Sequence, residues 1–176
     1  MEGTSEIRTK RLLLRRYRSE DANELYEKLG KDPQMYKYSG WNPYADLSMA
    51  RETVQRFIDS YADTSFYGWA IEYGVKLIGA IGAYDYEGAK DQIEVGFSIE
   101  RCSWGQGFAT EALTDVLAYL TEHEGIGTVT AWCASENIGS MKAMLKAGMK
   151  QTHTEKNGLE IDGKLYDKLF FRYNAG

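Results

Sequence analysis

Alternation of apolar and polar residues identifies the most regular strand of the chain at residues 92–99. Apolar residues occupy its odd-numbered positions and polar or small residues its even-numbered positions, the period of two that is typical of a half-buried strand. Residues 107–123 then carry apolar side chains at helical spacing, and a second apolar run covers 126–132. We expect this strand–helix–strand unit to place its two strands parallel and adjacent, because the helix returns the chain to the same end of the sheet.

The rest of the pattern predicts strands and helices that interleave along the chain. The expected elements are strands at 11–17, 66–72 and 76–84 with a tight turn at Tyr73–Gly74, helices at 19–29 and 50–61, a short helix that begins at Asn137 and ends at Gly148, and a C-terminal hairpin that turns at Asp162–Gly163. Ser19 is expected to cap the first helix, and Ile138, Met141 and Leu145 are expected to face the core. No repeat or linker separates these elements, so the sequence predicts one α/β (α+β) domain over residues 1–176.

Composition narrows the classes of function. The 176 residues are 43% hydrophobic and carry a net charge of -5, which supports a packed core and argues against nucleic acid as a partner. With two histidines and two cysteines, a metal site is not expected, and Cys102 and Cys133 are interpreted as buried, reduced thiols. No apolar run reaches the ~18 residues of a membrane span and no export signal is evident, so we expect a cytoplasmic protein without membrane contact.

The stretch "ERCSWGQGFATEAL", residues 100–113, joins the strand at 92–99 to the following helix through two glycines. Backbone N–H groups at a helix N-terminus lack internal acceptors and can bind phosphate, and glycine allows a close approach. An ordinary strand–helix turn explains the spacing equally well. The dinucleotide pattern G-x-G-x-x-G is not completed, because Thr110 stands at its third small position.

The same stretch resembles the acetyl-CoA loop of the GNAT superfamily of acetyltransferases, whose pattern is Q/R-x-x-G-x-G/A. Gly107 and Ala109 match the pattern, whereas Trp104 stands at its Q/R position. An aromatic residue there is usual in the RimJ/RimL-like branch, which "SWGQGFATEAL" resembles closely. Three further segments also resemble that branch: the opening "RLLLRRYRSEDANELYEKL", the strand "QIEVGFSI" and the closing "DGKLYDKLFF". The spacing of Asn137, Ser140 and Gly148 resembles its motif B, so the likeness spans nearly the whole chain.

The resemblance implies a single GNAT-like domain. It has a mixed, mostly antiparallel, twisted sheet of about six to seven strands, with about four helices. A V-shaped splay between the strands at 92–99 and 126–132 would admit the pantetheine arm of acetyl-CoA. The implied contacts to this cosubstrate are Phe97, Ser98, Ile99, Trp104, Gly105, Gln106, Gly107, Phe108, Ala109, Thr110, Asn137 and Ser140.

Two residues are candidates for proton transfer. Glu94 lies between Ile93 and Val95, where burial raises the pKa of a carboxyl group and suits it to act as a base. A paired or solvated strand glutamate is the equal alternative. Ser140 is the candidate acid for the leaving thiolate, because the position at which many GNAT members carry tyrosine is Met144 here. Asn137 is also expected to cap the helix that it begins.

The acceptor side is less defined by sequence. Aromatic residues in the irregular segment 31–46, together with Tyr84, are candidates for binding the amine; the four are Tyr36, Tyr38, Trp41 and Tyr84. A loop fixed by its own aromatic packing is the alternative for the first three. Gly96 either marks a bulge that opens the splay or is an ordinary packing glycine.

These expectations describe transfer of an acetyl group from acetyl-CoA to a primary amine. The acceptor is the α-amino group of a protein, such as a ribosomal protein, or a small amine. The alternative from another class is an acyl-CoA-binding sensor without turnover. A homodimer is compatible with the resemblance.

Overall fold

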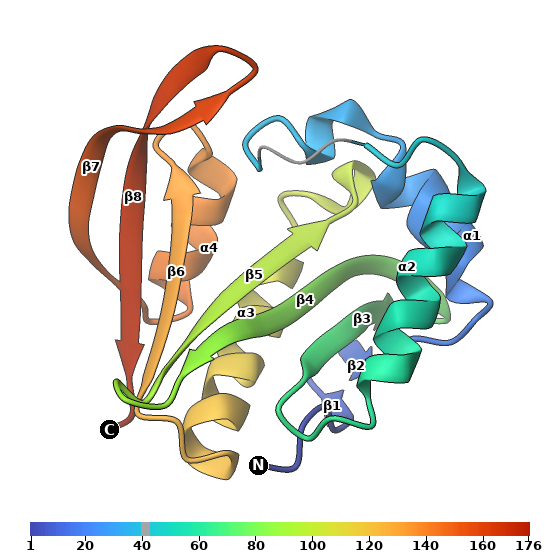
Figure 1. Cartoon of the computed structure of the whole chain (residues 1–176), viewed down its shortest axis with the longest axis horizontal. Helices are drawn as coiled ribbons and strands as arrows, with labels where there is room; N and C mark the ends of the chain where they lie inside the picture. The colour runs from blue at the N-terminus through green and yellow to red at the C-terminus, as the bar shows by residue number, and fades with distance from the viewer. Residues whose placement is uncertain (40–42) are drawn as a thin grey trace.

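The computed structural model describes residues 1–39 and 43–176, in which one mixed sheet of eight strands is flanked by helices (Figure 1). The strands are β1 (Ile7–Arg8), β2 (Leu12–Arg15), β3 (Tyr67–Tyr73), β4 (Lys76–Glu87), β5 (Gln92–Ile99), β6 (Thr128–Ala134), β7 (Lys150–Ile161) and β8 (Lys164–Asn174), in the spatial order β1-β2-β3-β4-β5-β6-β8-β7. Only the β5–β6 pair is parallel among these strands. The predicted fold class is confirmed, with one more strand than expected, because β1 is too short to show a period.

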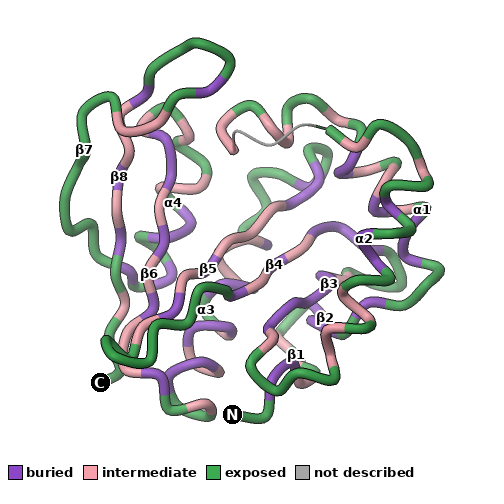
Figure 2. The backbone as a smooth tube through the Cα atoms, in the orientation of Figure 1, coloured by how far each residue is buried: buried purple, intermediate pink, exposed green. Residues whose placement is uncertain are grey.

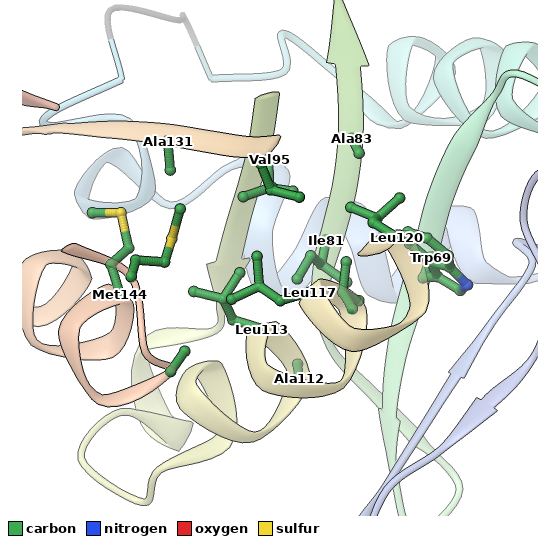
Figure 3. Packing of buried hydrophobic residues seen from close by; sticks show 14 of the residues in the cluster. Trp69, Ile81, Ala83, Val95, Ala112, Leu113, Leu117, Leu120, Ala131 and Met144 are labelled. Atoms are coloured by element: carbon green, nitrogen blue, oxygen red, sulfur yellow. The ribbon is translucent and has the colours of Figure 1, made fainter. Parts of the chain in front are cut away.

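The helices form two groups on opposite faces of the sheet (Figure 1). They are α1 (Asp21–Leu25), α2 (Leu47–Ser60), α3 (Phe108–Ala118) and α4 (Ile138–Lys146), with single π-helical turns extending α1 over Tyr26–Gly30 and α3 over Tyr119–His123 and short 3-10 turns at Pro33–Met35 and Arg101–Ser103. Helices α1 and α2 pack over β3 and β4, whereas α3 and α4 cover the other face. Figure 3 shows Leu113 and Leu117 of α3 beneath Val95 of β5, in the main core cluster.

The predicted splay is present between β5 and β6. The two strands pair only through Gln92↔Thr128, Ile93↔Val129 and Glu94↔Thr130. Beyond Glu94, β5 stays paired with β4 as far as Ile99, and β6 stays paired with β8 as far as Ala134. Figure 1 shows the two strands diverging from this short contact. The edge of β5 that faces β6 is therefore left without a strand partner after Glu94.

A buried ion cluster fixes α1 to the sheet. The Arg15 guanidinium donates to both carboxylate oxygens of Asp21 at 2.8 Å and to Glu72 Oε2 at 2.6 Å. Hydrogen bonding to Asp21 raises the pKa of Arg15 against the opposing effect of burial. Removing one partner from such a buried cluster leaves an uncompensated charge, so the cluster specifies how α1 packs.

Several local predictions need correction. Helix α1 follows Glu20 without a side-chain cap, so Ser19 is not its cap. Ile138 and Leu145 are 47% and 46% exposed, because α4 instead packs through Ala143 and Met144. The β3–β4 turn pairs Tyr73 with Lys76 and is therefore centred one residue later than expected.

The C-terminal hairpin has the predicted turn. Asp162 and Gly163 have φ values of 50° and 76°, and Ile161 pairs with Lys164, as in the two-residue turns favoured by Asp-Gly. Strand β7 lies at the edge of the sheet and is exposed along most of its length (Figure 2).

Candidate functional site

The glycine-rich loop forms a group of free donors at the start of α3. Gly105 and Gly107 have φ values of 75° and 81°, left-handed conformations that favour glycine. Gly107 is the N-cap residue, and the first helical bond runs from the N–H of Glu111 to its carbonyl at 3.0 Å. Within the described residues, the backbone N–H groups of 105–110 have no hydrogen-bond acceptor. Donors in this arrangement bind an anion.

Arg11 holds this loop from the turn between β1 and β2. Its Nε donates to Glu111 Oε2 at 2.6 Å, its Nη1 donates to the Gln106 carbonyl at 2.9 Å, and its guanidinium lies 4.5 Å from the Phe108 ring centroid. The other carboxylate oxygen of Glu111 accepts from Thr9 Oγ1 at 2.6 Å. Burial acts to raise the pKa of Glu111, but hydrogen bonds from Thr9 and Arg11 outweigh it and lower that pKa. The negative charge beside the free donors is thus paired.

Arg11 was not among the predicted site residues, because it belongs to the basic and apolar run of residues 10–18, which is typical of a strand with one solvated face. About a hundred residues separate Arg11 from the loop, and only the topology of the sheet brings them together.

Trp104 has a structural contact at the entrance to the loop. Its Nε1 donates to the Ile99 carbonyl at 2.6 Å, although 52% of the residue is exposed. The indole therefore satisfies an acceptor at the last residue of β5. Phe108 is buried in the core, so it offers backbone rather than side chain to a ligand.

Glu94 is the last residue of β5 that pairs with β6, and it lies where the two strands separate. Its Oε1 accepts a hydrogen bond of 3.0 Å from Trp132 Nε1 on β6. Burial raises the pKa of Glu94, while Trp132, Lys168 and Tyr84 oppose the increase and Asp85 adds to it. The net direction is upward, as expected for a half-buried carboxyl group.

Trp132 and Lys168 were not among the predicted site residues. The Lys168 ammonium lies 4.4 Å from the Trp132 ring centroid and 5.0 Å from that of Phe170. Phe170 in turn stacks on His153 at 4.2 Å between ring centroids. Their signal in the sequence is weak, because alternation marks them only as the less buried face of their strands.

Gly96 does not mark a bulge. It pairs regularly with Gly82, and the irregularity in the β4–β5 ladder lies between Tyr84 and Glu87, where Asp85 has a φ of 55°. A Cβ atom on Gly96 would lie 2.5 Å from the Tyr84 hydroxyl oxygen. Gly96 is therefore a packing glycine that makes room for Tyr84.

Asn137 and Ser140 lie in the turn that follows β6. The Asn137 side chain caps α4 by accepting from the Ser140 N–H at 3.3 Å, as predicted. The Ser140 hydroxyl is not needed for this cap. Met144 is 1% exposed and packs in the core, so it has no polar role at the site.

The aromatic candidates separate into different environments. Tyr38 meets Tyr166 of β8 edge to face at 5.8 Å between ring centroids, joining the 31–46 segment to the C-terminal hairpin. Tyr36 is half-buried, and burial raises its pKa to about 12. Tyr84 is 45% exposed. Trp41 lies outside the described residues.

The two cysteines differ in their environments. Cys133 is buried as expected, and burial raises its pKa to about 11, but Cys102 is exposed, contrary to the prediction. Cys102 lies in the 3-10 turn before the glycine loop, where only Ser103 turns inward. No cluster of three or more His, Cys, Asp or Glu side chains able to hold a metal ion occurs in the part of the chain that the structure describes. None of the described helices is long and apolar enough to cross a membrane.

An open sheet that parts between two parallel strands, with a loop of free N–H donors at the start of the next helix, is typical of an acyltransferase type of fold. The sequence family described as the acetyltransferase (GNAT) domain matches residues 11–150. The chain therefore belongs to this family and is an N-acetyltransferase.

Relatives of similar length agree with this assignment. The chain is 27% identical over 169 residues to the uncharacterised N-acetyltransferase p20 of Bacillus licheniformis, covering 93% of this chain and 92% of that protein. It is 26% identical to the uncharacterised N-acetyltransferase YoaA of Bacillus subtilis (strain 168), covering 92% of each.

Solved structures share the fold. A GNAT-family acetyltransferase from Bacillus anthracis has a TM-score of 0.85 at 21% identity, covering 97% of this chain and 99% of the other. RimL, a ribosomal L7/L12 α-N-protein acetyltransferase in complex with coenzyme A, has a TM-score of 0.87 at 16% identity, covering 97% and 98%. The microcin C7 self-immunity acetyltransferase MccE, in complex with acetyl-CoA and AMP, has a TM-score of 0.84 at 17% identity, covering 94% and 93%.

Proposed function

We propose that this protein transfers the acetyl group of acetyl-CoA to a primary amine at the splay between β5 and β6. The observation that carries the proposal is the combination of free N–H donors at 105–110, in the loop that follows β5, with the edge of β5 that has no strand partner beyond Glu94. The donors suit the pyrophosphate of the coenzyme, because a helix N-terminus favours negative charge. The edge of β5 at Phe97, Ser98 and Ile99 has no strand partner on this side, although Trp104 bonds the Ile99 carbonyl. It suits the amides of the pantetheine arm, which would bind as an added strand.

The proposed proton transfers use Glu94 and Ser140 in separate steps. The acceptor amine must be neutral to attack the thioester carbonyl, and Glu94 accepts the proton that the nitrogen loses, directly or through water. A backbone N–H near Gly96 or Phe97 stabilises the carbonyl oxygen as negative charge develops on it. The carbon–sulfur bond then breaks, and the departing thiolate takes a proton from the Ser140 hydroxyl, which regains it from water as Glu94 releases the amine proton to water. Asn137 supports this arrangement by fixing the first turn of α4.

Two acceptor types remain as proposals: a protein α-amino group and a small amine. In an unstructured peptide the pKa of an α-amino group is ~7.7–8.0, against ~10.4 for a lysine side chain, so the α-amino group needs less help from a base. The likeness to RimL supports a protein N-terminus, and the likeness to MccE supports a smaller acceptor. Half-buried Tyr36 and Tyr38 and exposed Tyr84 are the proposed acceptor contacts.

Release of free thiol from acetyl-CoA tests the proposal. The acceptor panel should contain peptides with free N-termini, the same peptides with blocked N-termini and an internal lysine, polyamines and aminoglycosides. We expect release with at least one acceptor and mass increase of that acceptor by one acetyl group. Tight coenzyme binding without thiol release from any acceptor would instead support an acyl-CoA sensor.

We also propose a cytoplasmic location.

A further inference from the structure

Tyr84 lies next to Glu94 on β4, the strand that flanks β5 on the side away from Trp132. In the β4–β5 ladder, Tyr84 lies directly across from Glu94, and cross-strand partners project their side chains from the same face of the sheet. The Tyr84 hydroxyl leans over Gly96, 2.5 Å from where a Cβ atom would be. Glu94 and Gly96 are two residues apart in β5, so the hydroxyl lies beside the carboxylate at the start of the splay.

We propose that Tyr84 is a positioning residue, which donates a hydrogen bond to Glu94 and keeps its carboxylate ionised and directed into the splay. Gly96 is also needed for this hydrogen bond, because a residue without a side chain leaves room for the Tyr84 hydroxyl. The inference rests on the role of Glu94 as the base in the proposed function.

The electrostatic setting supports a permanent donor at this position. Burial raises the pKa of Tyr84 to about 12, and the negative charges of Glu94 and Asp85 contribute in the same direction. The hydroxyl therefore keeps its proton throughout the physiological range. Its interaction with Glu94 lowers the pKa of that carboxyl group, although by less than the hydrogen bond from Trp132.

Other charged groups around Glu94 are accounted for. Lys168 on β8 lowers the pKa of Glu94, and Asp85 in the β4 irregularity raises it. Arg172 lies on β8 opposite Thr130, which is itself the partner of Glu94 on β6. A change at Tyr84 that leaves these charges in place isolates the effect of the hydroxyl.

Gly96 provides an independent way to displace the same hydroxyl. A Cβ atom at position 96 would meet the Tyr84 oxygen at 2.5 Å but the nearest ring carbons at an ordinary 3.4 Å. Gly96→Ala should therefore push the hydroxyl away in the native protein and fit without conflict when residue 84 is phenylalanine. The two substitutions are thus expected to be strongly non-additive.

The test measures the Glu94 carboxyl group directly, by carbon-13 NMR titration of the full-length protein. Tyr84→Phe should raise the pKa of Glu94 by about one unit, since a hydrogen bond to a charged group has about that effect. Gly96→Ala should raise it similarly, and the double variant should match Tyr84→Phe alone. Tyr86→Phe is the matched control; Tyr86 is 40% exposed and bonds Asp91 instead, so the titration should not change.

Kinetics connect the hydrogen bond to the reaction. The acid limb of the kcat/KM profile should move to higher pH by the same amount in Tyr84→Phe, with the Kd for acetyl-CoA unchanged. An unchanged titration and an unchanged acid limb in Tyr84→Phe would overturn the proposal, even if Gly96→Ala failed to fold. A raised pKa in a protein that acetylates no amine would confirm the hydrogen bond and refute Glu94 as the base, so the two failures are distinguishable.

Discussion

Trp132 and Glu94 are joined by a 3.0 Å hydrogen bond across the opening between β6 and β5. The last backbone pair of these strands is Glu94↔Thr130, two residues before Trp132. The Trp132 side chain therefore connects β6 to β5 beyond the last backbone pair, and its partner is the carboxylate proposed as the base. The same ring lies under the Lys168 ammonium, so one indole orders both charges.

Trp132→Phe should raise the pKa of Glu94 and slow the reaction at low pH. The substitution removes the Nε1–H donor but keeps an aromatic surface for Lys168. A base works only when ionised, so loss of a donor that lowers its pKa moves the acid limb of kcat/KM to higher pH. Lys168→Met should shift the limb in the same direction by removing a positive charge. A profile that does not move in either variant would contradict this placement of Glu94.

Glu94→Gln should lower kcat by about 10²–10⁴-fold, the usual contribution of a general base. The Kd for acetyl-CoA should stay within about twofold, because Glu94 is not a proposed coenzyme contact and glutamine has a similar volume. Stopped-assay thiol release and calorimetry separate the two quantities. Glu87→Gln is a suitable control, since Glu87 is exposed and pairs with Lys90. Loss of affinity with normal turnover would refute the proposed role.

Gly107→Ala should weaken coenzyme binding beyond its effect on stability. A left-handed conformation costs a residue with a side chain about 1–2 kcal/mol, and relief of that strain would turn the donors at 105–110 away from the ligand. Gly74→Ala is the matched control, with a φ of 66° and open space around its Cβ position in the β3–β4 turn. Both variants should lose similar stability in denaturant titrations. Calorimetry should show reduced coenzyme affinity for Gly107→Ala alone.

Arg11→Ala should reduce coenzyme affinity about tenfold, as expected for loss of one hydrogen bond of ~1.5 kcal/mol to a charged group. The variant releases the Gln106 carbonyl and leaves Glu111 as an unpaired negative charge beside the proposed pyrophosphate site. Arg8→Ala controls for the loss of a positive charge, because Arg8 pairs with Glu6 and its side chain is 73% exposed. Equal affinities of the two variants would show that Arg11 does not position the loop.

Ser140→Ala should lower kcat about tenfold or more if its hydroxyl protonates the thiolate, as a general acid contributes at least that factor. Helix α4 should remain capped, because Asn137 bonds the Ser140 N–H rather than the hydroxyl. Thermal unfolding is therefore expected to match that of the native protein. Unchanged kcat with an intact helix would assign Ser140 a structural role. Ser135→Ala, in the turn before α4, is the control.

The positions of most strands along the chain and the parallel pairing of β5 with β6 were predictable, because both depend on local patterns. Alternation at 92–99 marked β5 with its observed bounds, and the glycines at 105 and 107 indicated the left-handed loop. Resemblance to the GNAT family supplied the divergence of β5 from β6, which periodicity alone does not encode. The cytoplasmic location and a homodimer stay predictions.

Contacts between distant segments were not predictable. The order of the strands in the sheet brings Arg11 and Trp132 to the site. The residues next to them in the sequence do not distinguish them from other residues on a less buried strand face. Ile138 and Leu145 were wrongly placed in the core, since apolar spacing on α4 does not show which of its faces meets the sheet. Gly96 was ambiguous because its role depends on the length of a side chain in another strand.

The short pairing between β5 and β6 divides the sheet into two parts, which are called plates here. One plate holds β1–β5 and is backed by α3, and the other holds β6–β8 and is backed by α4, with α3 and α4 in contact beneath the seam. Three residue pairs, the Trp132 bond and the main hydrophobic cluster, which includes side chains of both parts, connect the two parts of the sheet. A ligand that binds along the free edge of β5 fills the space between the two plates and restricts their relative motion. Amide exchange in β6 and β8 should therefore slow when the ligand binds, although neither strand gains a new strand partner.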